Sequence, residues 1–524
     1  MTVSHEQRRT FAIISHPDAG KTTLTEKLLH AGGAIHLAGQ VKARGESRRA
    51  RSDWMKIEQE RGISVTSSVM TFERNGVLFN LLDTPGHEDF SEDTYRTLTA
   101  VDSAIMVIDA AKGIEAQTRK LFEVCRLRDI PIITFVNKVD REGQDPFELL
   151  DQVHDELQLD IAPRVWPLGM GGLFHGTFDL EANTFTTSSK GTLSPDTVIT
   201  CDGLEDNRLD DMVDDQVLES ARENMELARE AYGHFDREAY RDGNQTPVVF
   251  GSALRDYGID PLLDLIAAEA PPPRPSPTAG RVVEPGEKEV TGFIFKVQAN
   301  MDKNHRDRIA FMRICSGDFK RGMKLRQVRT GKDIMVHSPI VFLAQDREIA
   351  DEAGAGDVIG IPNHGTIRVG DTFTQGEEIR FTGLPAFAPE ILRRVRLVDT
   401  GKVKQLRQAL QDLSEEGLIQ VFKPDIGTQF VVGVIGVLQL EVVVDRARNE
   451  YKVELDFEPT PYSMARWLRS DDERALDAFI HANRNSVMTD RDGDPVFLAQ
   501  GAWELNFKVS NHEDIQFLKT KELE

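Results

Sequence analysis

Cysteine is scarce in this chain of 524 residues, which has only Cys125, Cys201 and Cys315. The three lie far apart in sequence and form no Cys-x-x-Cys pair, so a zinc or redox site is not expected. Reduced thiols in a reducing compartment are the simplest interpretation.

Long apolar segments are also missing. The first apolar run, Phe11–Ile14, is too short for the core of a signal peptide. No segment is long and apolar enough to span a bilayer. We therefore expect a cytoplasmic protein that has no membrane among its partners.

Positive charge is in deficit. The chain has 63 Lys and Arg against 86 Asp and Glu, which gives a net charge of −23. Proteins that bind nucleic acids through charge are usually basic. DNA is therefore not expected as a partner, and contact with RNA would need a local basic face on an acidic body.

What the sequence does contain is an alternation of apolar runs and helical patterns over its first half. The near-continuous apolar character of the runs predicts a parallel sheet buried on both faces, in an α/β doubly wound domain. The predicted strands are Phe11–Ser15, Val77–Asp83, Ala104–Asp109, Ile132–Asn137 and Val248–Gly251. The predicted crossover helices are Thr22–His30, Gln117–Arg128 and Asp260–Ala270. We assign residues 1–270 to this domain, with an insertion around 155–215 that indicates a hairpin or two.

The second half divides into three segments. Residues 271–280 are rich in proline, which predicts a stiff, extended linker. Residues 281–385 contain short alternating strands and glycine-rich turns, the pattern of a small antiparallel β-barrel. Residues 386–524 show a β-α-β-β-α-β order that predicts an α+β ferredoxin-like domain, followed by a C-terminal extension of about 60 residues whose structure the pattern leaves open.

A phosphate-binding loop lies between the first strand and the first helix. Residues 15–22, Ser-His-Pro-Asp-Ala-Gly-Lys-Thr, have the Walker A arrangement, with Ser15 at the position of the first glycine. Backbone N–H groups of such a loop and the following helix N-terminus attract phosphate. Lys21 would reach the β and γ phosphates, and the Thr22 hydroxyl would bind Mg²⁺.

A second motif, Asp83-Thr84-Pro85-Gly86-His87, ends the strand Val77–Asp83. A carboxylate at this place can hold Mg²⁺, as in other phosphate-loop enzymes. Gly86 would offer its N–H to the γ phosphate, and His87 would orient the attacking water. We predict His87 as the catalytic residue and Asp83 as a metal ligand.

A third motif, Asn137-Lys138-Val139-Asp140, selects the base. The Asp140 carboxylate can accept hydrogen bonds from the N1 and N2 donors of guanine, a pair that adenine does not offer. Asn137 and Lys138 would support the base and the phosphate loop, and the turn at Ser252 and Ala253 would direct a backbone N–H at guanine O6. The predicted ligands are therefore GTP and GDP with Mg²⁺. The residues predicted to contact the nucleotide are Ser15, His16, Pro17, Asp18, Ala19, Gly20, Lys21, Thr22, Thr23, Gly86, Asn137, Lys138, Asp140, Ser252 and Ala253.

The segment Arg61–Thr66 lies where the nucleotide-sensing loop, switch I, is expected. Ser64 is predicted as the second hydroxyl ligand of Mg²⁺, after Thr22, with Thr66 as the alternative. A basic run, Lys42–Arg51, precedes this segment. A loop that orders around the γ phosphate would bring such a run to a polyanionic partner.

With these motifs the sequence resembles the translational GTPases, and within them the bacterial peptide chain release factor three family, also called class II release factors. The residues that carry the resemblance are Ile14–Thr23, Ser52–Met55, Glu60–Ser68, Asp83–Ser91 and Gly436–Val442. The last of these is similar to the third domain of elongation factor G.

The resemblance implies a ribosome-stimulated GTPase of translation termination that drives class-one release factors off the ribosome after peptide release. It implies the ribosome and class-one release factors as partners, and we expect the chain to act as a monomer. It also implies the roles given above for Asp18 and Ser64, and an apolar gate at Pro17 and Ile63 beside His87. A second basic group is expected to contact ribosomal RNA together with Lys42–Arg51. That group consists of Arg393, Arg394, Arg396, Lys402, Lys404 and Arg407.

Other functions stay open on the sequence alone. A metabolic GTPase shares the second motif and a β-barrel, but its barrels would follow one another, whereas here an α+β unit follows. Elongation factor G would need two further domains after that unit. A GTP-sensing scaffold with little hydrolysis would have no use for His87.

Overall fold

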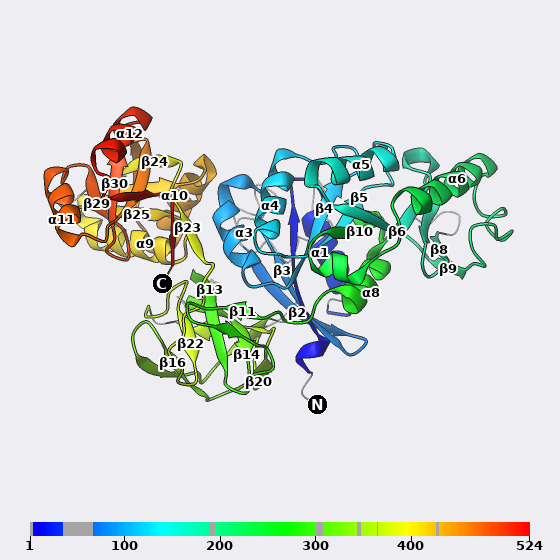
Figure 1. Ribbon diagram of the computed structural model, residues 1–524, viewed down its shortest axis with the longest axis horizontal. Coiled ribbons are helices and arrows are strands. Elements are labelled where there is room, and N and C mark those ends of the chain that lie inside the picture. Colours follow the sequence, from blue (N-terminus) through cyan, green and yellow to red (C-terminus); the bar gives the residue numbers. More distant parts are fainter. Residues whose placement is uncertain are drawn as a thin grey trace.

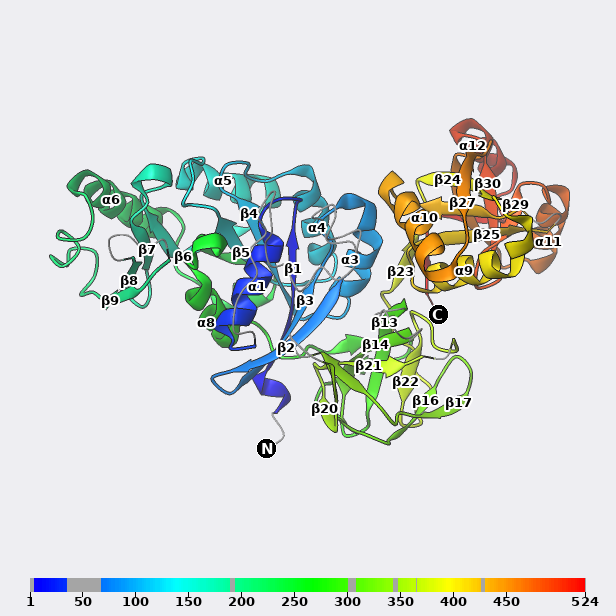
Figure 2. The same cartoon turned by 180° about the vertical axis from the view of Figure 1, so that it is seen from behind.

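The computed structural model describes residues 4–34, 67–188, 194–299, 308–342, 347–363, 365–425 and 429–523. Figures 1 and 2 show a large N-terminal domain, a barrel beside its lower edge and a C-terminal domain that faces both. One continuous hydrophobic cluster contains residues of all three, among them Leu98, Phe293 and Trp467. In the described ranges we find no helix with the length and apolar character needed to cross a membrane.

The N-terminal domain is an α/β domain around one mixed sheet. Its strands are β1 (Arg8–Ser15), β2 (Ser68–Arg74), β3 (Val77–Asp83), β4 (Ser103–Asp109), β5 (Ile132–Asn137), β6 (Asp160–Leu168), β7 (Gly176–Asp179), β8 (Thr184–Thr187), β9 (Thr197–Thr200) and β10 (Gln245–Phe250). Its helices are α1 (Lys21–Ala31), α3 (Ser91–Leu98), α4 (Ala116–Arg126), α5 (Pro146–Leu157), α6 (Asp215–Ala231), α7 (Arg237–Arg241) and α8 (Ile259–Glu269). The strand order is β2-β3-β1-β4-β5-β10-β6-β7-β8-β9, and the strands from β3 to β6 are parallel.

Burial on both faces explains the apolar runs. Ala12 and Ile14 of β1 pack in one hydrophobic cluster with Leu121 of α4, whereas Phe11 and Ile13 pack in another with α1 and α8. The predicted doubly wound sheet is confirmed. The insertion around 155–215 contains the kind of hairpins that the sequence indicated, formed by β6, β7, β8 and β9. These strands extend the main sheet, which β6 joins as a parallel strand.

An antiparallel β-barrel follows, as predicted. Its strands are β13 (Thr291–Ala299), β14 (Arg308–Ser316), β15 (Asp318–Lys320), β16 (Lys324–Gln327), β17 (Lys332–Met335), β18 (Ile340–Phe342), β19 (Arg347–Ile349), β20 (Glu352–Gly354), β21 (Val358–Pro362) and β22 (Thr372–Thr374). The preceding proline-rich segment, predicted as a stiff, extended linker, is also bonded to the residues around it. Short strands β11 (Ser276–Pro277) and β12 (Val282–Val283) pair there, and the Arg274 N–H donates to Asp102 of the first domain at 2.9 Å.

The C-terminal domain contains two β-α-β-β-α-β units in one sheet. Its strands are β23 (Pro385–Phe387), β24 (Ile391–Leu397), β25 (Gln420–Pro424), β26 (Val431–Val434), β27 (Leu455–Pro459), β28 (Met464–Arg469), β29 (Val487–Thr489), β30 (Pro495–Ala499), β31 (Gln516–Leu518) and β32 (Thr520–Glu522). Its helices are α9 (Val403–Glu415), α10 (Val437–Tyr451), α11 (Glu473–Ala482) and α12 (Ala502–Asn511). The order β27-β24-β26-β25-β29-β30-β28-β31 repeats the same four-strand arrangement on both sides of the β25–β29 pair.

The first of these units is the predicted ferredoxin-like unit. The extension that the sequence left open forms the second unit, with a separate small core around Phe479 and Phe497. The chain then returns, because β32 pairs with β23 at the start of the domain. The two ends of the C-terminal domain are thereby tied together.

Buried ion pairs fasten the barrel to the first domain. Arg313 of β14 donates to Asp102 at 2.6 Å, and Arg8 of β1 donates to Asp357 at 3.0 Å. All four side chains are nearly inaccessible to solvent. Removing one member of such a pair leaves an uncompensated buried charge, so these contacts favour one fixed arrangement of the two domains.

Candidate nucleotide site and its switch

The predicted phosphate loop connects β1 to α1. Ser15 ends β1 in an extended conformation, paired with Val107 of β4, which any residue can adopt without strain. The turn is made further on, where Asp18 (φ 66°) and Gly20 (φ 96°) have left-handed backbone conformations. Helix α1 begins at Lys21, so its free N–H groups face the loop as the motif requires.

Gly20 is needed for a second reason. A Cβ atom at this position would lie 2.3 Å from the Asn137 side-chain nitrogen. That nitrogen donates to the Ala19 carbonyl at 2.8 Å. The phosphate loop is therefore held in place by the base-recognition motif, which is 118 positions later in the chain.

Lys138 makes a second connection between the same two loops. Its Nζ donates to the Asp18 carbonyl and to the Asp109 carboxylate, both at 2.6 Å. Burial alone would raise the pKa of Asp109, but the hydrogen bond from Lys138 lowers it below its ordinary value. Asp109 was not predicted, although it ends a strand at the carboxyl edge of the sheet, where functional side chains gather.

The turn after β10 is also bonded to Asn137. The Ala253 N–H donates to Asn137 Oδ1 at 2.9 Å, so Ala253 supports the Asn137 side chain. Ser252 is fully buried, and its hydroxyl accepts the Arg255 N–H at 3.3 Å, which closes the turn. Both residues hold the turn in shape, and a role of this turn in reading guanine O6 stays a proposal.

The carboxylate predicted to read the base, Asp140, has a partner that the sequence did not suggest. Arg255 Nε lies 3.1 Å from Asp140 Oδ2, and the Asp140 side chain is 4% exposed. No motif marks an arginine three residues after Ser252. Its place in the 3₁₀ turn Ala253–Arg255 decides the contact.

Two of the predicted metal ligands, Thr22 and Asp83, belong to elements that Lys21 connects. Lys21 contacts the Asp83 carboxylate directly, which brings its neighbour Thr22 to the carboxyl end of β3. A hydroxyl and a carboxylate are hard oxygen donors of the kind that Mg²⁺ prefers, so the residues present fit this ion. A Cβ at Gly86 would lie 3.9 Å from both Lys21 and Pro17, which places the second motif beside the phosphate loop. This motif and the turn after it, residues 83–90, are the predicted counterpart of switch I and are called switch II below.

His87 stands at the start of a short 3₁₀ turn, η2 (Glu88–Phe90). Its Nδ1 accepts the Asp89 N–H at 3.2 Å, and its ring packs edge-on to Phe90. The side chain is 35% exposed. The ring is therefore held on one side by its own turn and is open to solvent on the other.

Switch I lies outside the described residues. The residues predicted there, Ser64, Thr66, Ile63 and the basic run Lys42–Arg51, all fall in this segment, so these predictions stay predictions. The first described residue after it is Ser67, whose N–H and hydroxyl both donate to Asp93 of α3, at 2.8 and 2.6 Å.

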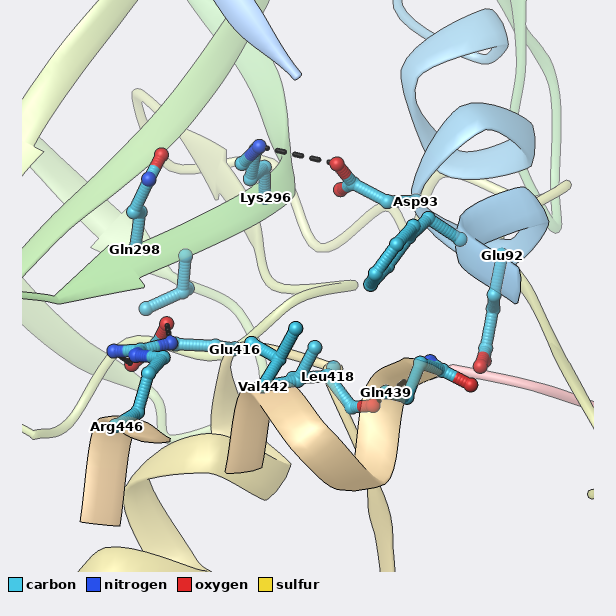
Figure 3. A pocket seen from close by; sticks show the side chains of 12 residues that line it. Glu92, Asp93, Lys296, Gln298, Glu416, Leu418, Gln439, Val442 and Arg446 are labelled. Carbon is cyan, nitrogen blue, oxygen red and sulfur yellow. Dashed lines mark hydrogen bonds and ion pairs between the residues drawn. The ribbon is translucent and has the colours of Figure 1, made fainter. Parts of the chain in front are cut away.

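Figure 3 shows a cavity where α3, β13 and α10 meet. Lys296 of the barrel donates there to Asp93 at 3.2 Å and to the Ser67 carbonyl at 2.6 Å. Burial would raise the pKa of Asp93, but the Lys296 charge and the hydrogen bonds from Ser67 lower it. The helix after switch II is thus bonded to the barrel and to the end of switch I by one ionised carboxylate.

The second basic group does not form one surface. Arg393 and Arg394 are adjacent on β24 and so point to opposite faces of the sheet. Arg396 is paired with Asp456 at 2.7 Å and with Glu458 at 3.3 Å, which offsets its charge. Lys404 and Arg407 are exposed on α9.

His16, in the phosphate loop, is buried beside Glu115 at 3.2 Å. Burial lowers the pKa of His16 below its ordinary value, although Glu115 favours the charged form. Because the unfolded chain binds this proton more readily, stability should fall as the pH drops below about 6.5. We expect His16→Gln to reduce the loss of stability between about pH 7 and about pH 5.5.

Urea denaturation of both proteins across this range measures the effect, with nucleotide absent throughout. His481→Gln, at an exposed position on α11, is the matched control and should keep the wild-type slope. An unchanged pH slope in His16→Gln would show that His16 is not the titrating group.

Comparison with known proteins agrees with this division of the chain. Residues 6–272, just over half of the chain, match the family described as the elongation factor Tu GTP binding domain. Residues 289–376 match elongation factor G domain 2, and residues 381–509 match the C-terminal domain of class II release factor RF3. The last match begins at the barrel's end and covers most of both β-α-β-β-α-β units.

A solved structure is similar over most of the chain. The crystal structure of a protein from Thermus thermophilus superposes with a TM-score of 0.70 at 26% sequence identity. The similarity covers 88% of this chain and 68% of that chain.

Proposed function

Since the chain belongs to the translational GTPases, in the class II release factor family, we propose that it is a ribosome-stimulated GTPase that releases class-one release factors after peptide release. The observation that carries the proposal is the RF3-type C-terminal domain at 381–509, docked on switch II. The partners in this role are the ribosome and class-one release factors, and the chain acts as a cytoplasmic monomer.

In GTP hydrolysis we assign a different role to each of the residues at the phosphate end of the site. The reaction is an in-line attack of water on the γ phosphorus, with negative charge spread over the phosphate oxygens. Lys21 offsets that charge and Gly86 offers its N–H to the γ phosphate, while His87 orients the water. Thr22 and Asp83, with Ser64 as a further ligand, would hold Mg²⁺, and the bound ion would supply additional positive charge to the phosphates.

Base selection rests on the other end of the site. Asp140 accepts from guanine N1 and N2, and Asn137 keeps the phosphate loop and the Ala253 turn in register with it. Asn137 and Lys138 support the pocket through contacts within the protein, so they act on the nucleotide through the loops that they hold.

The test of the proposal is GTP turnover with and without purified ribosomes. We expect a large increase in turnover with ribosomes, because the exposed side of the His87 ring is open to a partner that can complete its orientation. In parallel, ribosomes carrying a labelled class-one release factor after peptide release should lose it faster when the chain and GTP are added. Equal turnover with and without ribosomes would favour a metabolic GTPase.

Ribosome binding should depend on salt and nucleotide. Contacts between basic side chains and phosphates release counterions, so we expect binding to weaken roughly tenfold or more between about 50 mM and about 200 mM salt. A non-hydrolysable GTP analogue should bind more tightly than GDP, because the γ phosphate orders switch I. Co-sedimentation across a salt series measures both effects.

Charge-neutralised variants show which basic group touches RNA. Neutralising Lys42–Arg51 should reduce the salt dependence. Neutralising Lys404 and Arg407 should have the smaller effect, because the second group is divided between surfaces. Ribosome binding that changes neither with salt concentration nor with the bound nucleotide would contradict the ribosomal role.

A further inference from the structure

Switch II is in direct contact with the C-terminal domain. The Leu438 N–H, in the first turn of α10, donates to Asp89 Oδ2 at 2.7 Å, although the two residues are 349 positions apart. Both views place α10 next to α3, the helix that follows η2 (Figures 1 and 2). Asp89 is two residues after His87, so the contact reaches the predicted catalytic residue almost directly.

The start of α10 is shaped to receive this carboxylate. A Cβ atom at Gly436, the N-cap of α10, would lie 1.9 Å from the Asp89 carboxyl carbon and within 2.3 Å of both its oxygens. The Gly436 backbone is in an extended conformation that alanine can adopt. Close approach of the carboxylate, and not backbone conformation, is therefore what requires glycine here.

The charge of Asp89 suits its position. The N-terminal N–H groups of a helix have no partners within the helix and carry partial positive charge. Gln439 accepts the N–H groups of the N-cap Gly436 and of Ile435 before it through its side-chain oxygen, at 3.1 and 2.7 Å. The Leu438 N–H is satisfied from another domain, by Asp89.

The same residue holds His87. The Asp89 N–H donates to His87 Nδ1 at 3.2 Å, and the other carboxylate oxygen, Oδ1, lies 3.3 Å from that nitrogen. One carboxylate oxygen thus faces α10 and the other faces the imidazole, whose Nδ1 accepts the Asp89 N–H when the ring is neutral and can donate to Oδ1 when it is protonated. A displacement of α10 relative to switch II acts on the residue that orients the ring.

We propose that Asp89 is a positioning residue that couples docking of the C-terminal domain to the orientation of His87. When α10 is docked, Asp89 is held at its N-terminus and the imidazole is held with it. When α10 moves away, the ring loses this support. The inference rests on the proposed catalytic role of His87.

The domains have other attachments, so the contact can be broken without undocking them. Lys296 bonds Asp93, Arg128 donates to the Gly383 carbonyl at 2.6 Å, and Tyr95 packs edge-on to Phe387. Variants at Asp89 or Gly436 are therefore expected to fold and to keep the three-domain arrangement.

Gly436→Ala is the sharpest test, because it lies in another domain and pushes on Asp89 without touching the nucleotide site. We expect ribosome-stimulated kcat for GTP hydrolysis to fall roughly tenfold to a hundredfold, the scale of a small misplacement of a catalytic group. GTP affinity and the KM for ribosomes should stay within about twofold, since neither the base nor the phosphate loop changes.

Gly501→Ala is the matched control. Gly501 is the N-cap of α12 in the same domain, is likewise extended, and has open space where a Cβ would lie. Its kcat should equal that of the wild type. A similar loss in both glycine variants would mean a general effect on the domain and would overturn the proposal.

A double-mutant cycle identifies the contact itself. Asp89→Ala should lower kcat about as much as Gly436→Ala, and Asp89→Asn should lower it less because an amide oxygen can still accept from Leu438. In a chain that already carries Asp89→Ala, adding Gly436→Ala should not lower kcat further, because the carboxylate that the new Cβ would meet is absent. Additive losses would overturn the coupling.

The outcome also separates this inference from the proposed function. Wild-type turnover in Gly436→Ala, together with a large loss in His87→Ala, would leave the catalytic role intact and refute the coupling. Normal turnover in His87→Ala would refute the catalytic role and the coupling with it.

Discussion

Replacing His87 with alanine is expected to lower ribosome-stimulated GTP hydrolysis roughly a hundredfold or more, the scale of losing a group that orients water or stabilises charge. GTP binding should stay near normal. The described contacts of the His87 ring are to Asp89 and Phe90 in its own turn, and none reaches the base or the phosphate loop. Single-turnover hydrolysis with ribosomes, alongside equilibrium binding of GTP, measures the two effects separately.

His481→Ala is the control for this experiment, because His481 is an exposed histidine of the C-terminal domain. It should hydrolyse GTP at the wild-type rate. A His87 variant that binds no nucleotide would indicate a folding defect, which circular dichroism would detect. Normal binding with normal turnover would remove His87 from the mechanism and favour a GTP-binding role without this histidine.

The second large effect is expected at the base. Asp140→Asn should weaken GTP binding about a hundredfold, because guanine N1–H and N2–H then meet an amide in place of a carboxylate acceptor. Xanthosine nucleotides should bind better than in the wild type, since xanthine offers an acceptor to the new amide donor. Competition binding with GTP and XTP is the measurement.

Arg255 provides the comparison that this variant needs. Asp140→Asn also breaks the ion pair between Asp140 and Arg255, whose Nε lies 3.1 Å from the carboxylate. Arg255→Ala breaks the same pair and keeps the carboxylate, so it should retain the preference for GTP. Loss of preference in both variants would assign the effect to the pair. An unchanged preference in Asp140→Asn would place guanine recognition elsewhere.

Local pattern was sufficient for much of the fold. Strands β3 and β5 begin and end at the residues that the sequence predicted, Val77–Asp83 and Ile132–Asn137. In these segments the apolar run is uninterrupted, so the neighbouring residues alone are enough to predict that each residue is buried in a strand. The strand-loop-helix order of the phosphate loop is local in the same sense.

Short strands were not predictable in this way. The last 60 or so residues contain β29 (Val487–Thr489) and β31 (Gln516–Leu518), each of three residues. Such a strand has too few residues to show an alternation, and it exists because β30 and β28 are there to pair with it. The second β-α-β-β-α-β unit therefore emerges only when the sheet is assembled.

In the functional site too, some features could be predicted from the sequence and others could not. By itself, the sequence predicted which residues carry the chemistry: Lys21 and Thr22 on a phosphate loop, and Asp83, Asn137 and Asp140 at strand ends. Their chemical types and their order along the chain suffice for that, because parallel strands bring their carboxyl ends to one edge. The family matches confirm a GTP-binding domain of the translational type over these residues.

Only the tertiary structure decided how these parts constrain one another. Asn137 holds the phosphate loop through the Ala19 carbonyl, Arg255 pairs with Asp140, and Asp89 reaches α10 in another domain. Each is a hydrogen bond or ion pair of about 3 Å between residues distant in sequence, and its strength depends on distance and burial. Neither quantity is encoded in spacing along the chain, so the first two contacts exist only once the N-terminal domain has folded, and the third only once α10 has packed against it.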